Sequence, residues 1–431
     1  MLAEAVAAAF LAAVLPAGAS AQPWSLARVL EAVRHHDPGV AAARAEGRAG
    51  RAAAASRWLS FSPRVSFEAG ATRSDDPALL FSQKLWQGRF GSADFDPLLL
   101  NQPPASTAYQ WGLRVEQPVW NGGNEFLGPM AAARRGRAAS ARAEAAIANR
   151  LLDAVETYVG ALRTRDAEAA ESLATAAAAE HRRAAVERFG HGLVSELDTL
   201  VAAARWAEAY ARRLDRRVER GVAFERLSQM VGEPVSPASI MAESAPPAIP
   251  ERAGRVPGLR SAEESAAALR LEARRAGFSL LPSINAQYTV FDYRGSDPLS
   301  SERRWTAAAM LSLPLWDGLQ RFQAWRSANA GAEAAAARVE ELRQRTVLAL
   351  ADARGRLGVA EERREAAHIG RHAAEEALRL AGERYHAGLL SFSDLLAADS
   401  DASRARLRAV EAESAALLAG YQLLHAMGEL K

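Results

Sequence analysis

A pair of histidines is the first feature of this sequence that could do chemistry. His368 and His372 lie four residues apart, so on a helix both imidazoles share one face and could hold a metal ion. No third ligand accompanies them, and two histidines do not complete a metal site. We expect a solvated helix face with no metal, and no cofactor of any other kind.

Loops and nucleophiles offer no better candidates. Gly190 and Gly192 flank a histidine, yet the third glycine and the preceding strand of a dinucleotide-binding loop are missing. The 431-residue chain has no cysteine, no Gly-x-Ser-x-Gly elbow and no Walker loop. The His35-His36 pair before Pro38 indicates a helix end. Because no acid, base and nucleophile converge, the sequence predicts a protein that is not an enzyme.

The charged residues are spread along the whole chain. Its 53 basic and 51 acidic side chains are interspersed rather than gathered into blocks, and the formal net charge is +2. Such mixing is typical of solvated helix faces, whereas a nucleic-acid-binding surface collects basic and aromatic residues in one patch. We therefore expect no nucleic acid partner.

The N-terminus indicates export. Residues 5–15 form a short apolar core, and residues 19–21 (ASA) supply the small-x-small pattern that signal peptidase reads, although Glu4 stands where a basic residue is usual. We assign residues 1–21 to a signal peptide. Downstream, arginine or glutamate interrupts every window of about 20 residues, the length that a membrane-spanning helix needs. Any membrane attachment must therefore use strands.

An internal repeat organises the rest of the chain. Residues 115–122 (VEQPVWNG) match 311–318 (LSLPLWDG), and residues 187–195 (ERFGHGLVS) match 383–391 (ERYHAGLLS), both with an offset of 196. Upstream, Pro63 aligns with Pro282 at an offset of 219, so the first copy holds 219 minus 196, or 23, extra residues. We divide the chain into a first repeat, a proline-rich equatorial linker and a second repeat: 22–232, 233–256 and 257–431.

Each repeat contains a predicted hairpin of strands. Apolar and polar residues alternate along 65–71, 109–119 and 284–290, which is the period of a strand with one apolar and one polar face. Strands of about ten residues cross a bilayer when tilted. We place the hairpins at about 64–120 and 283–316, with the extra residues in a long apolar loop of the first, at about 74–107, which we expect outside the cell, folded on itself or over the mouth.

The remaining residues predict helices of unusual length. Apolar residues step by three or four between positions 147 and 162, and alanine dominates, which favours helix. One long helix of about 100 Å is matched in length by two helices of roughly 35 residues laid end to end. The expected helices are 25–60, 122–189 and 195–231 in the first repeat, and in the second a helix after Pro257, followed by 318–385 and 391–428.

Four strands cannot close a barrel by themselves. A sheet in lipid tolerates no open edge, because unpaired backbone groups there cost several kcal/mol each. About eight strands make the smallest closed barrel, so two or more chains must pool their hairpins.

As an ordered and duplicated set, these motifs resemble the TolC-like outer membrane efflux proteins. The set comprises the QPVWNGG and LPLWDG turns after strands, the paired turns at 187–198 and 383–394, and the LLPS entry to the third strand at 280–283. The resemblance covers essentially the whole mature chain. It implies a mixed α and transmembrane β fold, in which a homotrimer forms a twelve-stranded β-barrel in the outer membrane, continued by a long periplasmic α-helical barrel.

The resemblance also implies function and partners. It implies a passive exit duct for efflux or type I secretion, with outer membrane lipid around the strands, a periplasmic adaptor and an inner-membrane transporter. The adaptor would dock on the helical tips: Gly192, Leu193, Ser195, Gly388, Leu389 and Ser391. Asp394 would narrow and gate the periplasmic end, with Asp198 as its less important repeat mate. The resemblance places a further aspartate where this chain has Ala397.

Two interpretations stay open at this stage. Trp111, Trp120, Trp305 and Trp316 fall in or at the ends of strands, where aromatic belts lie in membrane barrels. We expect such a belt. The alternative to the duct is a soluble periplasmic coiled-coil adaptor or scaffold, which would share the export signal and the long helices. Adaptors have one helical hairpin, however, whereas this sequence predicts two.

Overall fold

The computed structural model describes residues 23–243, 247–279, 281–294 and 302–430, so the signal peptide expected at 1–21 lies outside the described residues. The chain divides into two compact units. The helical unit comprises Met1–Glu46, Arg142–Leu259 and Leu342–Lys431, and the sheet unit comprises Gly47–Ala141 and Arg260–Glu341.

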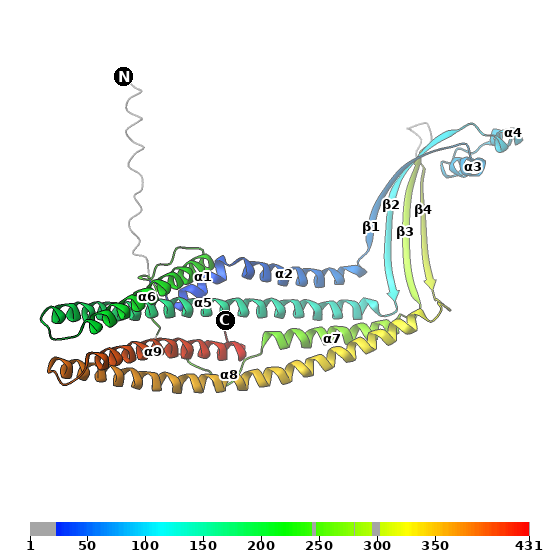
Figure 1. Cartoon of the computed structure of the whole chain (residues 1–431). Helices are drawn as coiled ribbons and strands as arrows, with labels where there is room; N and C mark the ends of the chain where they lie inside the picture. The colour runs from blue at the N-terminus through cyan, green and yellow to red at the C-terminus, as the bar shows by residue number, and fades with distance from the viewer. Residues whose placement is uncertain (1–22, 244–246, 280, 295–301, 431) are drawn as a thin grey trace, which may run out of the picture. The chain divides into compact units, whose positions relative to one another are not determined.

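Long helices and four strands dominate the described residues (Figure 1). In chain order the elements are α1 (Leu26–His36), α2 (Pro38–Trp58), η1 (Leu59–Phe61), β1 (Arg64–Ser74), α3 (Pro77–Trp86), η2 (Ser92–Phe95), α4 (Pro97–Asn101), β2 (Ser106–Asn121), α5 (Asn124–Gly190), α6 (Glu196–Val231), α7 (Pro257–Phe278), β3 (Ser283–Arg294), β4 (Glu302–Ser312), α8 (Gln320–His386) and α9 (Phe392–Ala426).

The helix expected over residues 25–60 is interrupted at Asp37. This residue is extended, with ψ of 124°, and separates α1 from α2. Proline disfavours the helical conformation of the residue before it, so Pro38 forces the break. The Asp37 carboxylate then caps α2 by accepting a hydrogen bond from the Val40 N–H at 3.0 Å. It also pairs with Arg150 on α5 at 2.8 Å. A single helix over this range was therefore a wrong prediction.

The four strands form one antiparallel sheet in the order β1-β2-β3-β4. The register sorts the side chains onto two faces, because directly paired residues point to the same side. One face is apolar and contains Phe67, Trp111, Leu113, Val290 and Trp305, among others. The opposite face carries mostly polar residues, such as Glu68, Arg114, Gln287, Thr289 and Arg304.

A bulge in β2 keeps its last residues on the correct faces. Pairing shifts between Pro118 and Trp120, so Val119 is the extra residue. Proline has no N–H to donate to the sheet, which makes this position suited to a bulge. After the bulge Trp120 pairs with Ile284, which lies on the apolar face. Without it, the alternation would place Trp120 on the polar face.

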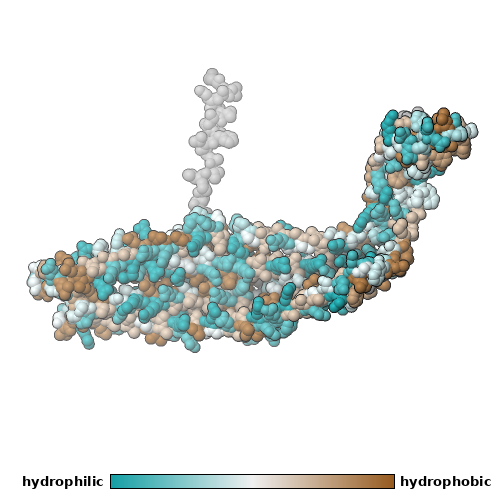
Figure 2. Space-filling model, turned by 45° about the vertical axis from the view of Figure 1, so that its right-hand side comes forward, coloured by the Kyte–Doolittle hydropathy of each residue, from teal (hydrophilic) through white to brown (hydrophobic). Residues whose placement is uncertain are grey.

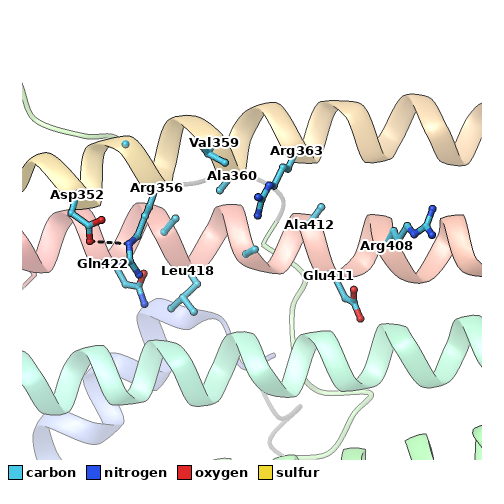
Figure 3. Close-up of a pocket in the computed structure, with 13 residues that line it drawn as sticks. Asp352, Arg356, Val359, Ala360, Arg363, Arg408, Glu411, Ala412, Leu418 and Gln422 are labelled. Carbon is cyan, nitrogen blue, oxygen red and sulfur yellow. Dashed lines mark ion pairs between the residues drawn. The ribbon is translucent and has the colours of Figure 1, made fainter.

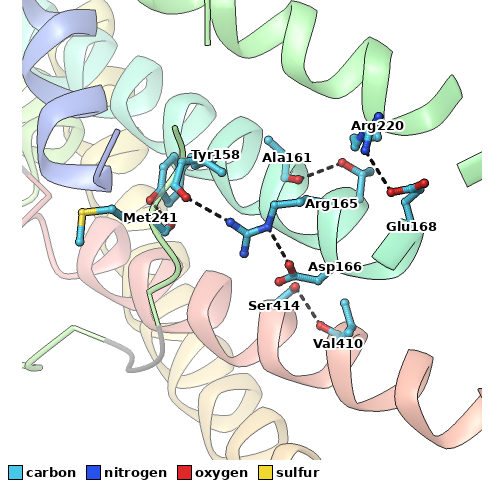
Figure 4. Close-up of polar contacts among 11 residues, drawn as sticks. Tyr158, Ala161, Arg165, Asp166, Glu168, Arg220, Met241, Val410 and Ser414 are labelled. Atoms are coloured by element: carbon cyan, nitrogen blue, oxygen red, sulfur yellow. Dashed lines mark hydrogen bonds and ion pairs between the residues drawn. The ribbon is translucent and has the colours of Figure 1, made fainter. Parts of the chain in front are cut away.

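The core of the helical unit surrounds the middle of α5. Leu151, Val155 and Tyr158 are fully buried there among residues of α1, α6 and α9. The Tyr158 hydroxyl donates to the Met241 carbonyl at 2.7 Å (Figure 4). It also lies 3.1 Å from the Trp24 carbonyl. Burial raises the pKa of this phenol well above its usual range. The first part of the proline-rich linker is thus fixed to the long helix.

None of the described helices combines the length and apolarity needed to cross a membrane. Within the described ranges, no group of three histidine, aspartate or glutamate side chains could hold a metal ion.

Candidate functional site

The two turns between long helices share one geometry. Gly192 and Gly388 have φ of 71° and 74°, a conformation that glycine adopts without strain. The next residue closes each turn on the preceding helix: the Leu193 N–H donates to the Arg188 carbonyl at 2.9 Å, and the Leu389 N–H donates to the Arg384 carbonyl at 2.8 Å. This is the arrangement with which helices commonly end at glycine.

Each turn is followed by a capped helix. Ser195 and Ser391 accept hydrogen bonds from the N–H groups of Asp198 and Asp394, at 3.3 and 3.1 Å. Both serine hydroxyls donate in return to the aspartate carboxylates, at 2.8 and 2.6 Å. The predicted gate residues therefore lie in the first turn of α6 and α9, where a negative charge also stabilises the helix N-terminus. The structure pairs each aspartate with the serine of its own turn.

Apolar side chains project from the tips into solvent. Leu193 and Leu389 are 71% and 77% exposed, and Leu197 and Leu200 of α6 are also largely exposed. Hydrophobic colouring is visible at this end of the helices, on the left of Figure 2. These four exposed leucines at the helical tips form a surface that is suited to binding another protein.

A buried cluster joins the two turns behind their exposed ends. The cluster joins α8 and α9 to α5 and α6, and its members are Tyr385, Phe392, Leu395, Leu396, Ala185 and Ala202. The guanidinium of Arg188 lies 4.4 Å from the centre of the Tyr385 ring, a cation–π contact between α5 and α8. The tips are thus one structural piece within a protomer.

An ion pair near the tips was missed by the sequence reasoning. The Asp399 carboxylate of α9 is buried and lies 3.8 Å from His181 Nε2 of α5. Burial raises the pKa of Asp399, although His181 and Arg406 oppose the shift. The sequence did contain a signal: Asp399 lies four residues after Leu395 and three before Ala402, within the stripe of α9 that faces the interior.

The sheet presents a surface suited to lipid. Phe67, Trp305 and Leu311 are 64–68% exposed on its apolar face. Trp111 and Trp305 contact aromatic neighbours across the strands, Phe67 at 6.4 Å and Tyr288 at 6.2 Å between ring centres. On the polar face, Arg114 pairs with Glu68 at 3.1 Å. Of the remaining belt candidates, Trp120 is half-buried, and Trp316 lies beyond the end of β4 and is 78% exposed.

An open groove of about 850 Å³ runs between α8 and α9 (Figure 3). Its floor consists of small and apolar residues, including Gly355, Ala360, Ala412, Ala415 and Ala419. Arginines line its rim, and Arg356 pairs with Asp352 at 2.8 Å. Small residues on neighbouring helices let a further helix approach closely.

A sequence comparison decides the family. The model of the outer membrane efflux protein family matches residues 29–233 and 249–429, nearly the whole described chain. The chain belongs to this family. The family is one of outer membrane channels, not enzymes, and the protein is an exit duct of the outer membrane with a helical periplasmic extension. No curated protein sequence matches the chain significantly.

Solved structures of other channels have the same fold as this outer membrane efflux protein. The outer membrane protein VceC of Vibrio cholerae is 21% identical, with a TM-score of 0.78 over 94% of this chain and 96% of that one. The Campylobacter jejuni CmeC outer membrane channel gives 15% identity and a TM-score of 0.77, covering 94% and 85%. The Neisseria gonorrhoeae MtrE outer membrane channel, in its open state, gives 20% and 0.76, covering 94% and 89%.

Proposed function

We propose that three copies of this chain form the duct, each contributing its four strands to a closed twelve-stranded barrel. The observation that carries the proposal is the two-faced sheet. Its outer strands, β1 and β4, each have one neighbour among the described strands, so each has a free edge, while its apolar face exposes Phe67 and Trp305. Free edges are not tolerated in lipid, and pairing β4 of one copy with β1 of the next removes all of them.

The same assembly accounts for the helices. The groove between α8 and α9 takes a helix of the neighbouring copy, which covers its apolar floor. The helices then form a periplasmic tunnel continuous with the barrel, built from the two repeats of each chain. The four tryptophans of the strand region lie at the membrane boundaries as an aromatic belt.

The helical tips bind the partner proteins. A periplasmic adaptor binds the exposed leucines around Gly192 and Gly388, with Ser195 and Ser391 holding the turns in shape, and the adaptor connects the duct to an inner-membrane transporter. Three Asp394 carboxylates at the tunnel end form a ring that favours cations, with Asp198 in a supporting place. Energy for transport comes from the transporter, because the duct itself is passive.

The periplasmic adaptor is the less favoured alternative. In a soluble adaptor, the apolar face of the four-stranded sheet would be exposed to water. Cell fractionation separates the two functions: we expect the protein in outer membranes, and recovery in the soluble periplasmic extract would refute the duct. Purified protein should also give stepwise single-channel currents in planar bilayers.

The tip assignment has its own test. Valine at Gly388 must adopt φ of 74°, which a β-branched residue strongly resists, so Gly388→Val should distort the turn and weaken adaptor binding. Gly382→Val is the matched control, since Gly382 is helical and nothing lies within 4 Å of an added Cβ. Full adaptor binding by Gly388→Val would show that the adaptor docks elsewhere.

A further inference from the structure

The long connection between β1 and β2 is a folded structure. We call residues 75–105 the cover segment. Asp76 and Asp96 cap α3 and α4 by accepting N–H bonds at 3.0 and 2.9 Å. Lys84 pairs with Asp94 at 2.6 Å. Three rings, those of Phe81, Phe90 and Phe95, contact each other edge to face, with centres 4.7 and 5.0 Å apart. These contacts give the segment one defined shape.

The cover segment is anchored on the second hairpin. The Trp86 ring lies 5.2 Å from the Tyr293 ring, and Arg304 Nε donates to the Trp86 carbonyl at 3.3 Å. A Cβ added to Gly88 would lie 3.3 Å from the Glu302 side chain, so the chain passes close to that residue as well. Figure 1 shows α3 beside the ends of β3 and β4. The loop of one hairpin thus reaches across to the other.

All three anchor residues belong to the polar face of the sheet. Tyr293 pairs directly with Glu302, and Arg304 pairs with Phe291, two residues before Tyr293 on the same face. The apolar face, with Val290 and Trp305, lies on the opposite side. The cover segment therefore bends toward the face that points to the interior once the sheet closes into a barrel.

The cover segment itself exposes apolar side chains. Phe95 and Leu98 are 64% and 69% exposed, and Leu85 and Leu99 are 47% and 44% exposed. Lipid cannot cover these side chains, because lipid contacts the other face of the sheet. In a closed barrel, the apolar groups available above the polar interior are the same four residues of the other copies.

We infer that the cover segments of three copies meet over the outer mouth of the barrel and pack through Phe95, Leu98 and Leu99 into an apolar cover that narrows the exit. This inference rests on the proposed trimer. Each cover segment contacts the cover segments of other copies of the chain, and this contact lies at the outer mouth of the barrel.

Cysteine cross-linking tests this contact directly, because the chain has no cysteine of its own. Leu98→Cys in the full-length protein in outer membranes should give a disulfide-linked dimer on denaturing gels after mild oxidation. Asp75→Cys is the matched control: this residue is exposed at the base of the segment, and we expect it to react with maleimide but not to cross-link. A Leu98→Cys protein that reacts with maleimide yet gives no more dimer than the control would overturn the inference.

Removal of the cover segment tests its effect on the exit. Ser74 and Ser106 are directly paired, so Asn-Gly can replace residues 75–105 as a two-residue hairpin turn. We expect roughly a twofold or larger rise in single-channel conductance with the oligomer mass unchanged. If the shortened protein still forms channels and their conductance is unchanged, the cover inference is wrong but the proposed duct stands. If the full-length protein forms no channels at all, the proposed duct is wrong.

Discussion

The two longest helices are equal in length but differ in how matched apolar positions near their middles are covered. Both α5 and α8 have 67 residues. At the repeat offset of 196, Leu151 of α5 corresponds to Val347 of α8. Leu151 is 1% exposed in the protomer core, whereas Val347 is 63% exposed, and the neighbouring Leu348 is 69% exposed. Equivalent apolar positions are thus covered in one repeat and open in the other.

The difference indicates which residues must cover the exposed apolar positions of α8. Around α5, residues of α1, α6 and α9 from the same chain form the core. On α8, Val359 and Ile369 continue the exposed apolar positions beyond Val347 and Leu348. Single exposed apolar residues are ordinary, but a series along one helix marks an interaction surface. We therefore assign the middle of α5 to folding of the protomer and α8 to assembly.

The largest effect should come from placing a charge on the open helix. Leu348→Asp buries an unpaired carboxylate in the contact between copies, and such a charge costs several kcal/mol. We expect the oligomer to dissociate while the protomer keeps its helix content, as measured by mass in mild detergent and by circular dichroism. An intact trimer with this substitution would remove α8 from the interface.

The core helix should respond in the opposite way. Leu151→Ala leaves a cavity in a fully buried site, which costs roughly 2–5 kcal/mol of unfolding free energy. The repeat mate Val347→Ala should change the stability of the dissociated protomer by only about 0.5 kcal/mol or less, as surface substitutions do. Urea unfolding of both variants measures the contrast. Equal losses would show that the two helices are equally covered within one chain.

These contrasts also show what sequence patterns can predict. Period-two alternation predicts strands because each strand has two different faces, and the motif repeat predicts the matching turns at Gly192 and Gly388. The break at Asp37 was missed because alanine-rich sequence on both sides favours helix and hides the effect of Pro38. The anchoring of Trp86 on Tyr293 could not be predicted, since it joins residues far apart in sequence. The same holds for His181 and Asp399.

The buried Asp37 carboxylate, which pairs with the partly exposed Arg150, has no equivalent at the matching position of the sequence. Burial alone would raise the pKa of Asp37, but the hydrogen bond from Arg150, the Val40 N–H and the charge of Arg150 together lower it. At the repeat offset of 219 the corresponding residue is Val256, the last residue of the linker. Asp37→Asn should therefore cost about 1–3 kcal/mol, the penalty for losing a hydrogen-bonded buried group.

The pH dependence of that cost follows from the lowered pKa. The unfolded carboxyl binds a proton first on acidification, so the contribution of Asp37 is complete above its ordinary value of 3.8 and is lost as pH falls through the lower folded value. Urea unfolding at neutral and strongly acidic pH should show the two proteins converging in acid. Asp401→Asn, which breaks an exposed pair with Arg404, should change little at either pH. A cost that did not depend on pH would contradict an ionised Asp37.

The smallest expected effect on stability comes from substitutions at the two tips. Asp394→Ala and Asp198→Ala each remove a carboxylate from the first turn of a helix and should each cost roughly 0.3–1 kcal/mol. If Asp394 forms the gate, only its replacement raises conductance or reduces cation preference in planar bilayers. Identical currents from both variants would leave Asp394 with a capping role alone.

In the proposed trimer, other copies cover the sheet edges and the apolar positions of α8 that one protomer leaves exposed. Mass measurement of the protein extracted from outer membranes in mild detergent tests it most directly. We expect a particle of three chains that sodium dodecyl sulfate dissociates. A monomer in mild detergent would contradict it.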